Sequence, residues 1–98
     1  MILNQLAKGR ECQVRLPGIC SFNSETTVLA HYSLAGISGR GLKAPDLLGA
    51  WCCSTCHDFV DGRKQSANFT KTEIRLMHCE GVLRTQYELL KMGKINSK

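Results

Sequence analysis

The chain has 98 residues, enough for one small domain, and no apolar run approaches the length needed to span a membrane. Its net charge of +5 comes from 13 Lys and Arg against 8 Asp and Glu, which only weakly favours an anionic partner such as nucleic acid. The first ten residues do not resemble a signal peptide, so we expect a cytoplasmic protein whose six cysteines stay reduced.

The N-terminal part is predicted to bring two cysteines together. Residues 2–8 favour one or two helical turns, and residues 11–16 favour an extended segment. The proline-glycine turn at residues 17–18 then places Cys12 and Cys20 close to each other.

Two apolar segments rich in β-branched or aromatic residues predict strands, at residues 26–31 and 47–51. The loop between them contains several glycines together with Arg40 and Lys43. A flexible, basic loop suits close approach to a phosphate backbone, and an ordinary long hairpin connection is the alternative interpretation.

Two helices are predicted after the second strand. Ser54 is expected to cap a short helix that runs to about Arg63. Thr70 and Glu73 have the spacing of a capping box, which predicts a longer helix that ends near Met92.

The longer helix carries an apolar stripe at steps of three and four residues, which predicts the face that packs on the rest of the domain. The stripe consists of Leu76, Cys79, Leu83, Tyr87 and Leu90. Within it Cys79 is expected to be a buried core thiol, whereas His78 lies off the stripe and receives no role.

The cysteine spacing predicts a metal site. Cys53 and Cys56 have the two-residue gap of a zinc knuckle, and Cys12 and Cys20 complete a set of four thiolates. Cys52 is expected to point to the other side of the strand end and to pack inside. A closed site of four sulfurs leaves no position for water, so we expect this zinc to be structural.

The order of parts resembles that of the HNH, or ββα-metal, nucleases: a cysteine pair, a strand ending in histidine, a loop, a strand, C-x-x-C-H and a helix. More closely, the chain resembles the YbcO-like family of small prophage-encoded nucleases, in the strings G-R-E-C-Q-V-R-L-P-G-I-C, E-T-T-V-L-A-H, P-D-L-L and C-S-T-C-H-D. This resemblance implies an α+β fold, a small zinc-stapled ββα-metal (HNH, or His-Me finger) domain over residues 1–92. An additional long C-terminal helix belongs to it, and residues 93–98 are expected to form a flexible tail.

The resemblance also assigns a catalytic site. His31 ends the first strand and corresponds to the general base of HNH enzymes, a task that suits a side chain that titrates near neutral pH. His57 and Asp61 lie four residues apart on the predicted short helix, so they share a face and can hold one divalent cation such as Mg, Mn or Zn. HNH proteins place metal ligands at these two helical positions.

One position departs from the HNH pattern. The residue before the base is commonly an Asp or His that binds the catalytic ion, and here it is Ala30. Asp46 either compensates for this ligand or takes the place of the Asn that orients the base. Otherwise water molecules complete the coordination of the cation.

We expect the partner to be DNA, and duplex DNA in particular, because aromatic residues that would stack on unpaired bases make up only 6% of the chain. The candidate contacts are Arg40, Lys43, Arg63 and Lys64, with Arg10 and Arg15 near the first cysteine pair. Two alternatives remain open. One is a non-catalytic zinc module of phage origin that binds DNA or a protein, and the other is a thiol redox protein that uses Cys53 and Cys56.

Overall fold

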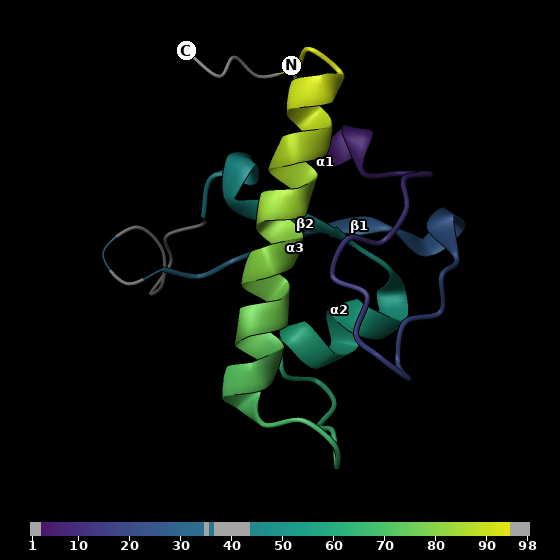
Figure 1. Cartoon of the computed structure of the whole chain (residues 1–98), viewed down its shortest axis with the longest axis vertical. Coiled ribbons are helices and arrows are strands. Elements are labelled where there is room, and N and C mark those ends of the chain that lie inside the picture. The colour runs from purple at the N-terminus through teal and green to yellow at the C-terminus, as the bar shows by residue number, and fades with distance from the viewer. Residues whose placement is uncertain (1–2, 35, 37–43, 95–98) are drawn as a thin grey trace.

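The computed structural model describes residues 3–34, 36 and 44–94 of the chain. Its helices and strands are α1 (Leu3–Leu6), β1 (Val28–His31), β2 (Gly49–Cys52), α2 (Ser54–Val60) and α3 (Lys71–Lys91), with short 3-10 turns at Ser24–Thr26 and Asp46–Leu48. Figure 1 shows α3 lying across the two strands, with α2 following β2 on the same side as the N-terminal segment. The expected α+β class is therefore confirmed. Among the described residues, no helix is both long and apolar enough to cross a membrane.

The strands form a two-stranded antiparallel sheet in which Ala30 pairs with Ala50 and His31 pairs with Gly49. All four residues of β2 are buried because α3 packs on this strand, whereas β1 is partly open to solvent. Both strands begin two residues later than predicted, since a 3-10 turn precedes each of them. His31 is the last residue of β1, as expected, so its side chain lies where the sheet ends.

The short helix α2 differs from its prediction at both ends. Its N-cap is Cys53 rather than Ser54, because the Cys53 Sγ accepts a hydrogen bond from the Cys56 amide at 3.4 Å. The helix ends at Val60, before the expected Arg63, and Gly62 follows with a φ of +86° that only glycine adopts easily. Helix α2 therefore begins at one of the predicted metal ligands.

Both ends of the long helix α3 agree with the sequence. The backbone amide of Glu73 donates a hydrogen bond to Thr70 Oγ1 at 3.1 Å, and Glu73 Oε1 accepts one from the backbone amide of Thr70 at 2.8 Å. These two hydrogen bonds form the predicted capping box. At the C-terminal end Gly93 has a φ of +73°, and the Lys94 amide donates to the Leu89 carbonyl at 2.9 Å. This pattern is a Schellman motif, so residues 93 and 94 are still tied to the helix.

The buried face of α3 is not the predicted one. Leu76, Leu83 and Tyr87 of the predicted stripe are 59%, 60% and 61% exposed, and Cys79 is only half-buried. The buried residues of α3 are instead Ile74, His78, Gly81, Val82, Thr85 and Leu89. The prediction was wrong because it followed the largest apolar side chains, whereas the helix approaches the core through small ones.

The core itself is small and rich in sulfur. Its main cluster joins Val14, Leu16 and Val82 to two alanines of the sheet and to four buried thiols, those of Cys12, Cys52, Cys53 and Cys56. Few large apolar side chains contribute, so a domain of this size has limited hydrophobic stabilisation of its own. The thiols therefore lie at the centre of what holds the fold together.

Candidate functional site

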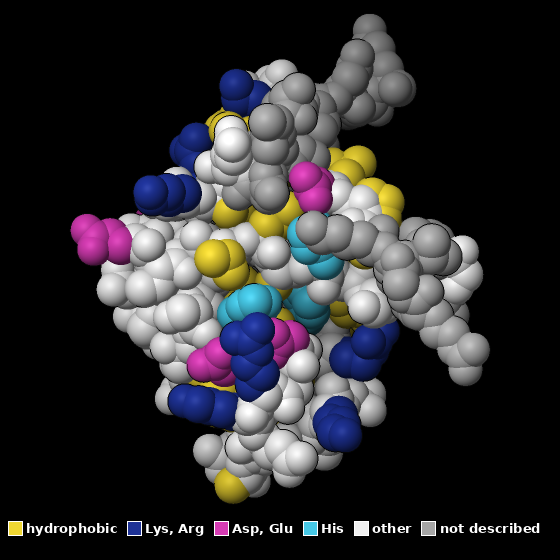
Figure 2. Space-filling model, turned by 180° about the vertical axis from the view of Figure 1, so that it is seen from behind, with side chains coloured by type: hydrophobic (Ala, Val, Ile, Leu, Met, Phe, Trp, Pro, Cys, Tyr) yellow, Lys and Arg dark blue, Asp and Glu magenta, His cyan; other side chains and the backbone are white. Residues whose placement is uncertain are grey.

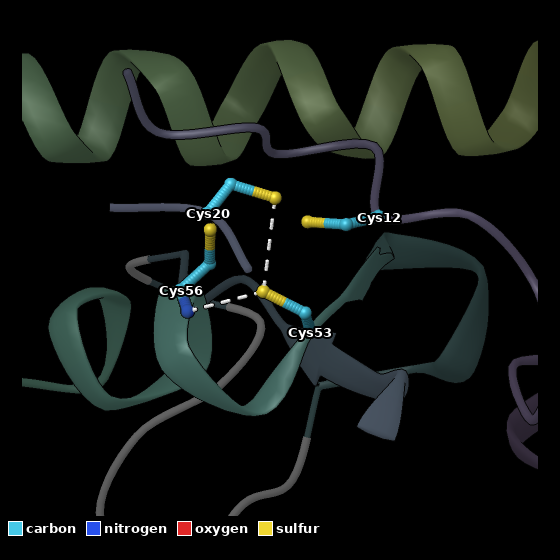
Figure 3. Close-up of side chains that lie close together, drawn as sticks. All are labelled: Cys12, Cys20, Cys53 and Cys56. Carbon is cyan, nitrogen blue, oxygen red and sulfur yellow. Dashed lines mark hydrogen bonds between the residues drawn. The ribbon is translucent and has the colours of Figure 1, made fainter. Parts of the chain in front are cut away.

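Four cysteines from two distant segments meet at one point. The sulfur atoms of Cys12, Cys20, Cys53 and Cys56 all lie within 4.8 Å of one another, and that of Cys20 is 3.8 Å from that of Cys53. Figure 3 shows the four sulfurs pointing toward a shared centre, with two coming from the N-terminal loop and two from the start of α2. The predicted set of four is thus brought together. Within the described residues it is the one group of three or more Cys, His, Asp or Glu side chains with this proximity.

Backbone amides wrap around these sulfurs. The amide of Arg15 donates to Cys12 Sγ, and the amide of Phe22 donates to Cys20 Sγ, each at 3.4 Å. Arg15 and Phe22 have φ values of 51° and 55°, and they are the two non-glycine residues with positive φ in the described part of the chain. A left-handed conformation costs an L-residue about 1–2 kcal/mol. Strain is therefore concentrated at the two loops that hold the first cysteine pair.

The thiols influence one another's ionisation. Hydrogen bonds from the thiols of Cys52 and Cys56 hold the pKa of Cys12 well below its usual value, whereas burial raises the pKa of Cys20 to about 11. Cys52 is fully buried and lies outside the group of four, as predicted, although its thiol reaches Cys12. The pKa of Cys53 is lowered as well, so two of the four thiols favour the thiolate that a metal ion needs as its ligand.

His31 is held by a carboxylate. The 3-10 turn before β2 places Asp46 so that its Oδ1 lies 2.7 Å from His31 Nε2. Both side chains are partly exposed, at 22% for His31 and 36% for Asp46. With Asp46 ionised, Nε2 carries the proton and donates it to the carboxylate, so Nδ1 keeps a lone pair. Of the two roles considered for Asp46, the geometry favours orientation of His31.

The predicted pair on α2 is also formed. His57 Nε2 lies 3.6 Å from Asp61 Oδ2, although Asp61 is the C-cap of α2 and not a residue within it. Arg63 bridges the same carboxylate and that of Asp58, with Nε 3.3 Å from Asp61 Oδ2 and Nη1 3.7 Å from Asp58 Oδ1. The expected DNA contact Arg63 is therefore paired with two acidic side chains at the end of α2.

His31 and His57 face a common hollow. A cavity of about 250 Å³ is lined by both histidines together with Asp61, Arg75 and His78. A wider groove of about 1180 Å³ also reaches His31 and His57 and continues to Lys8. Figure 2 shows the histidine side chains gathered on one face, with both acidic and basic side chains around them. The two histidines thus stand where two hollows meet.

Three residues beside this cavity were not identified from the sequence. His78 is buried and its Nε2 lies 2.9 Å from the Ala30 carbonyl oxygen, so the expectation that it has no role was wrong. Burial lowers the pKa of His78, which keeps the ring neutral and able to donate from Nε2. Tyr32 packs edge-on against this ring at 5.0 Å, and Arg75 lies 4.6 Å over the Tyr32 ring. These contacts join the end of β1 to a helix more than forty residues later, so no pattern of neighbouring residues in the sequence predicts them.

The other expected DNA contacts have different surroundings. Arg40 and Lys43 lie outside the described residues. Lys64 lines a further cavity of about 470 Å³ together with Arg75. Arg10 donates to the Leu6 carbonyl and lies 5.6 Å over the Trp51 ring. Arg15 donates its side chain to the Cys12 carbonyl at 3.0 Å. Arg10 and Arg15 thus support the local structure.

Comparison with known proteins identifies the family. The family profile described as "Putative nuclease YbcO" matches residues 1–94. The chain belongs to the YbcO family. Two curated relatives agree: "Putative nuclease YbcO" of Escherichia coli (strain K12) is 48% identical over 97 residues, and "Putative nuclease ybcO" of Enterobacteria phage 82 matches equally well. In both cases the match covers 97% of each chain.

A solved structure has a similar fold. It is described as "Structure of a putative bacteriophage protein from Escherichia coli str. K-12 substr. MG1655" and is 42% identical to this chain. The superposition has a TM-score of 0.77 and covers 92% of this chain and 98% of that chain. The fold described above is therefore shared with this bacteriophage protein over most of both chains.

Proposed function

We propose that this YbcO-family protein is a metal-dependent endonuclease that hydrolyses phosphodiester bonds in DNA. The observation that carries the proposal is the shared cavity: His31 with its Asp46 partner, and His57 with Asp61, face one hollow from β1 and α2. A sheet of two strands followed by a helix has the order of elements expected for a ββα-metal domain, which supports the proposal. The names of both relatives, which contain the word nuclease, support the same reaction class.

In this proposal His31 is the general base. The Asp46 carboxylate accepts a hydrogen bond from Nε2–H and fixes the ring, which leaves Nδ1 to take a proton from the attacking water. The water oxygen then bonds to phosphorus while the bond to the leaving sugar oxygen breaks. Positioned bases of this kind contribute about 10²–10⁴-fold to a reaction rate. Because Asp46 is a carboxylate, it also stabilises the imidazolium that forms.

His57 and Asp61 fit a divalent cation. Neighbouring ligands of an octahedral ion such as Mg²⁺ lie about 3 Å apart, so the 3.6 Å between His57 Nε2 and Asp61 Oδ2 needs only a small side-chain rotation. When bound, such an ion supplies positive charge for the phosphate and the leaving oxygen. Arg63 competes for the Asp61 carboxylate, but as an exposed ion pair it is held weakly.

The four-cysteine group fits a structural zinc. Four sulfurs at about 2.3 Å from a tetrahedral zinc lie about 3.8 Å from one another, which is the distance between Cys20 and Cys53. The amides that donate to sulfur, and the strained loops that aim them, also support a site for metal thiolates. Because its four ligands close the coordination shell, this metal would hold the fold and take no part in hydrolysis.

A second candidate function is a non-catalytic zinc module that binds DNA. Ala30 offers no ligand atom from its side chain, and its carbonyl is occupied by His78. Two protein ligands then remain for the catalytic cation. Such a module would bind DNA through its basic surface without cutting it.

Cleavage of a supercoiled plasmid separates the two candidates. Purified protein is incubated with Mg²⁺, Mn²⁺ or Zn²⁺ and compared with His31→Ala, whose fold is checked by circular dichroism. The endonuclease nicks the plasmid, and His31→Ala does not. Binding of DNA without nicking in any of these ions would leave only the second candidate.

A further inference from the structure

Arg75 brings a cation from α3 to the cavity of His31 and His57. It lines this cavity of about 250 Å³ and also the adjoining one of about 470 Å³, and Asp61 lines both as well. Lys64 and Lys71 line the second cavity further out. Arg75 therefore lies between the two histidines and the larger cavity, which Lys64 and Lys71 also line.

Contacts with the end of β1 hold the Arg75 guanidinium in place. It lies 4.6 Å over the Tyr32 ring, and Nη2 donates to the Ser33 carbonyl at 3.3 Å. Tyr32 is in turn packed edge-on against His78, which is three residues after Arg75 on α3 and is fixed by the Ala30 carbonyl. Stacking of this kind orients a guanidinium while leaving the donors on its edges available.

Arg75 also differs from the other arginine near the site. Arg63 is paired with the carboxylates of Asp58 and Asp61. In the described part of the chain Arg75 has no such ion pair, and its hydrogen bond to the Ser33 carbonyl uses one of five N–H donors. An exposed guanidinium that Tyr32 and Ser33 orient, and that has no ion pair, can donate two hydrogen bonds to two oxygens of one phosphate.

We propose that Arg75 forms a phosphate-binding site, which holds the DNA backbone beside the phosphate that His31 and His57 face. The guanidinium donates two hydrogen bonds to non-bridging oxygens of one phosphate, and Lys64 and Lys71 attract the strand beyond it. This inference rests on the proposed function, because it assigns the same cavity a DNA substrate.

The test measures DNA binding without cleavage. All variants are made in the His31→Ala background, and their affinity for a short fluorescein-labelled duplex is followed by fluorescence anisotropy at several salt concentrations. Arg75→Gln removes the charge at the site. Lys94→Gln is the matched control, since it removes one exposed charge just after the C-terminal end of α3. Thermal melts confirm that both variants are folded.

We expect Arg75→Gln to weaken binding about tenfold, as for loss of a charge-assisted hydrogen bond, and Lys94→Gln to change it less than about twofold. The slope of log affinity against log salt should fall by about one for Arg75→Gln, because one phosphate contact is lost. Arg75→Lys should keep this slope while recovering only part of the affinity, since lysine lacks the planar fork.

Two results would overturn the inference in different ways. If Arg75→Gln and Lys94→Gln have equal affinities while the wild-type protein nicks plasmid, the phosphate site is wrong and the proposed function stands. If the His31→Ala protein does not bind the duplex at low salt and the wild-type protein does not nick plasmid, the proposed function fails as well.

Discussion

The contact of α3 with the N-terminal segment makes Gly81→Ala a sensitive test of the packing. A Cβ at position 81 would lie 2.8 Å from Val14 Cγ2, 3.1 Å from Val14 Cα and 3.2 Å from the Gln13 carbonyl oxygen. The methyl group of Val14 can turn away, but two of these atoms belong to the backbone and must shift. Overpacking of this kind costs about 1–3 kcal/mol. Alanine in place of a helical glycine returns about 1 kcal/mol.

The net expectation is a loss of about 0–2 kcal/mol in the free energy of unfolding, which is the packing cost less the gain in helix propensity. For a domain of this size each kcal/mol lowers the thermal midpoint by about 4–8 °C, so circular dichroism resolves the effect. Glu80→Ala is the control, because residue 80 is exposed on the same helix and should change stability by less than about 0.5 kcal/mol. A Gly81→Ala protein that is more stable than wild type by about 1 kcal/mol, the gain in helix propensity alone, would show that α3 does not approach residues 13 and 14 this closely.

Three further predictions concern the thiol group, the strained loops and His78. A strong zinc chelator should abolish the cooperative thermal transition. The binding free energy of a structural zinc is about 10–16 kcal/mol, whereas the free energy of unfolding of a whole domain is only about 5–15 kcal/mol. An unchanged thermal melt would exclude the metal. Phe22→Gly should be more stable than Phe22→Ala by about 1 kcal/mol in urea, because only glycine relieves the left-handed conformation; equal stabilities would refute the strain. Burial lowers the pKa of His78 from 6.5, so the folded state binds fewer protons there, and stability is lost as pH falls below about 6.5. In the His78→Gln variant the free energy of unfolding should no longer fall in this pH range. If the variant keeps the full pH dependence of the wild type, groups other than His78 cause it.

The parts of the fold that could be predicted are those in which neighbouring residues decide the structure. The capping box of Thr70 and Glu73 closes within four residues, and the pairing of His57 with Asp61 follows from one helical turn. The approach of the four cysteine sulfurs to one another could also be predicted, because the spacing within each pair is typical of sulfurs that meet at one point.

The buried face of α3 could not be predicted in the same way. Hydrophobic periodicity favoured Leu76, Leu83 and Tyr87, but the face that packs is set by how closely two backbones approach. Gly81 and Thr85 allow that approach, and Thr85 Oγ1 also accepts the Trp51 amide at 2.9 Å. These contacts join segments that are far apart in the sequence, so the hydrophobic periodicity of one helix cannot predict them.

The surroundings of the candidate site show the same division. The place of His31 at the end of β1 could be predicted from the sequence. Its contact with Asp46 could not, because it depends on the path of the loop between the two strands. His78 received no role because its partner, the Ala30 carbonyl, is far away in the chain. Arg75 was overlooked for the same reason, since Tyr32 and Ser33 fix its position.

The most direct test of the account is the rate at which metal-loaded protein nicks a supercoiled plasmid in Mg²⁺ or Mn²⁺, compared between wild type and His31→Gln. Glutamine can still donate a hydrogen bond to Asp46 but cannot take a proton from water, so the comparison isolates the base. The account predicts nicking by wild type and a loss of at least about hundredfold in His31→Gln. Equal rates for the two proteins, or no nicking by wild type in either ion, would contradict it.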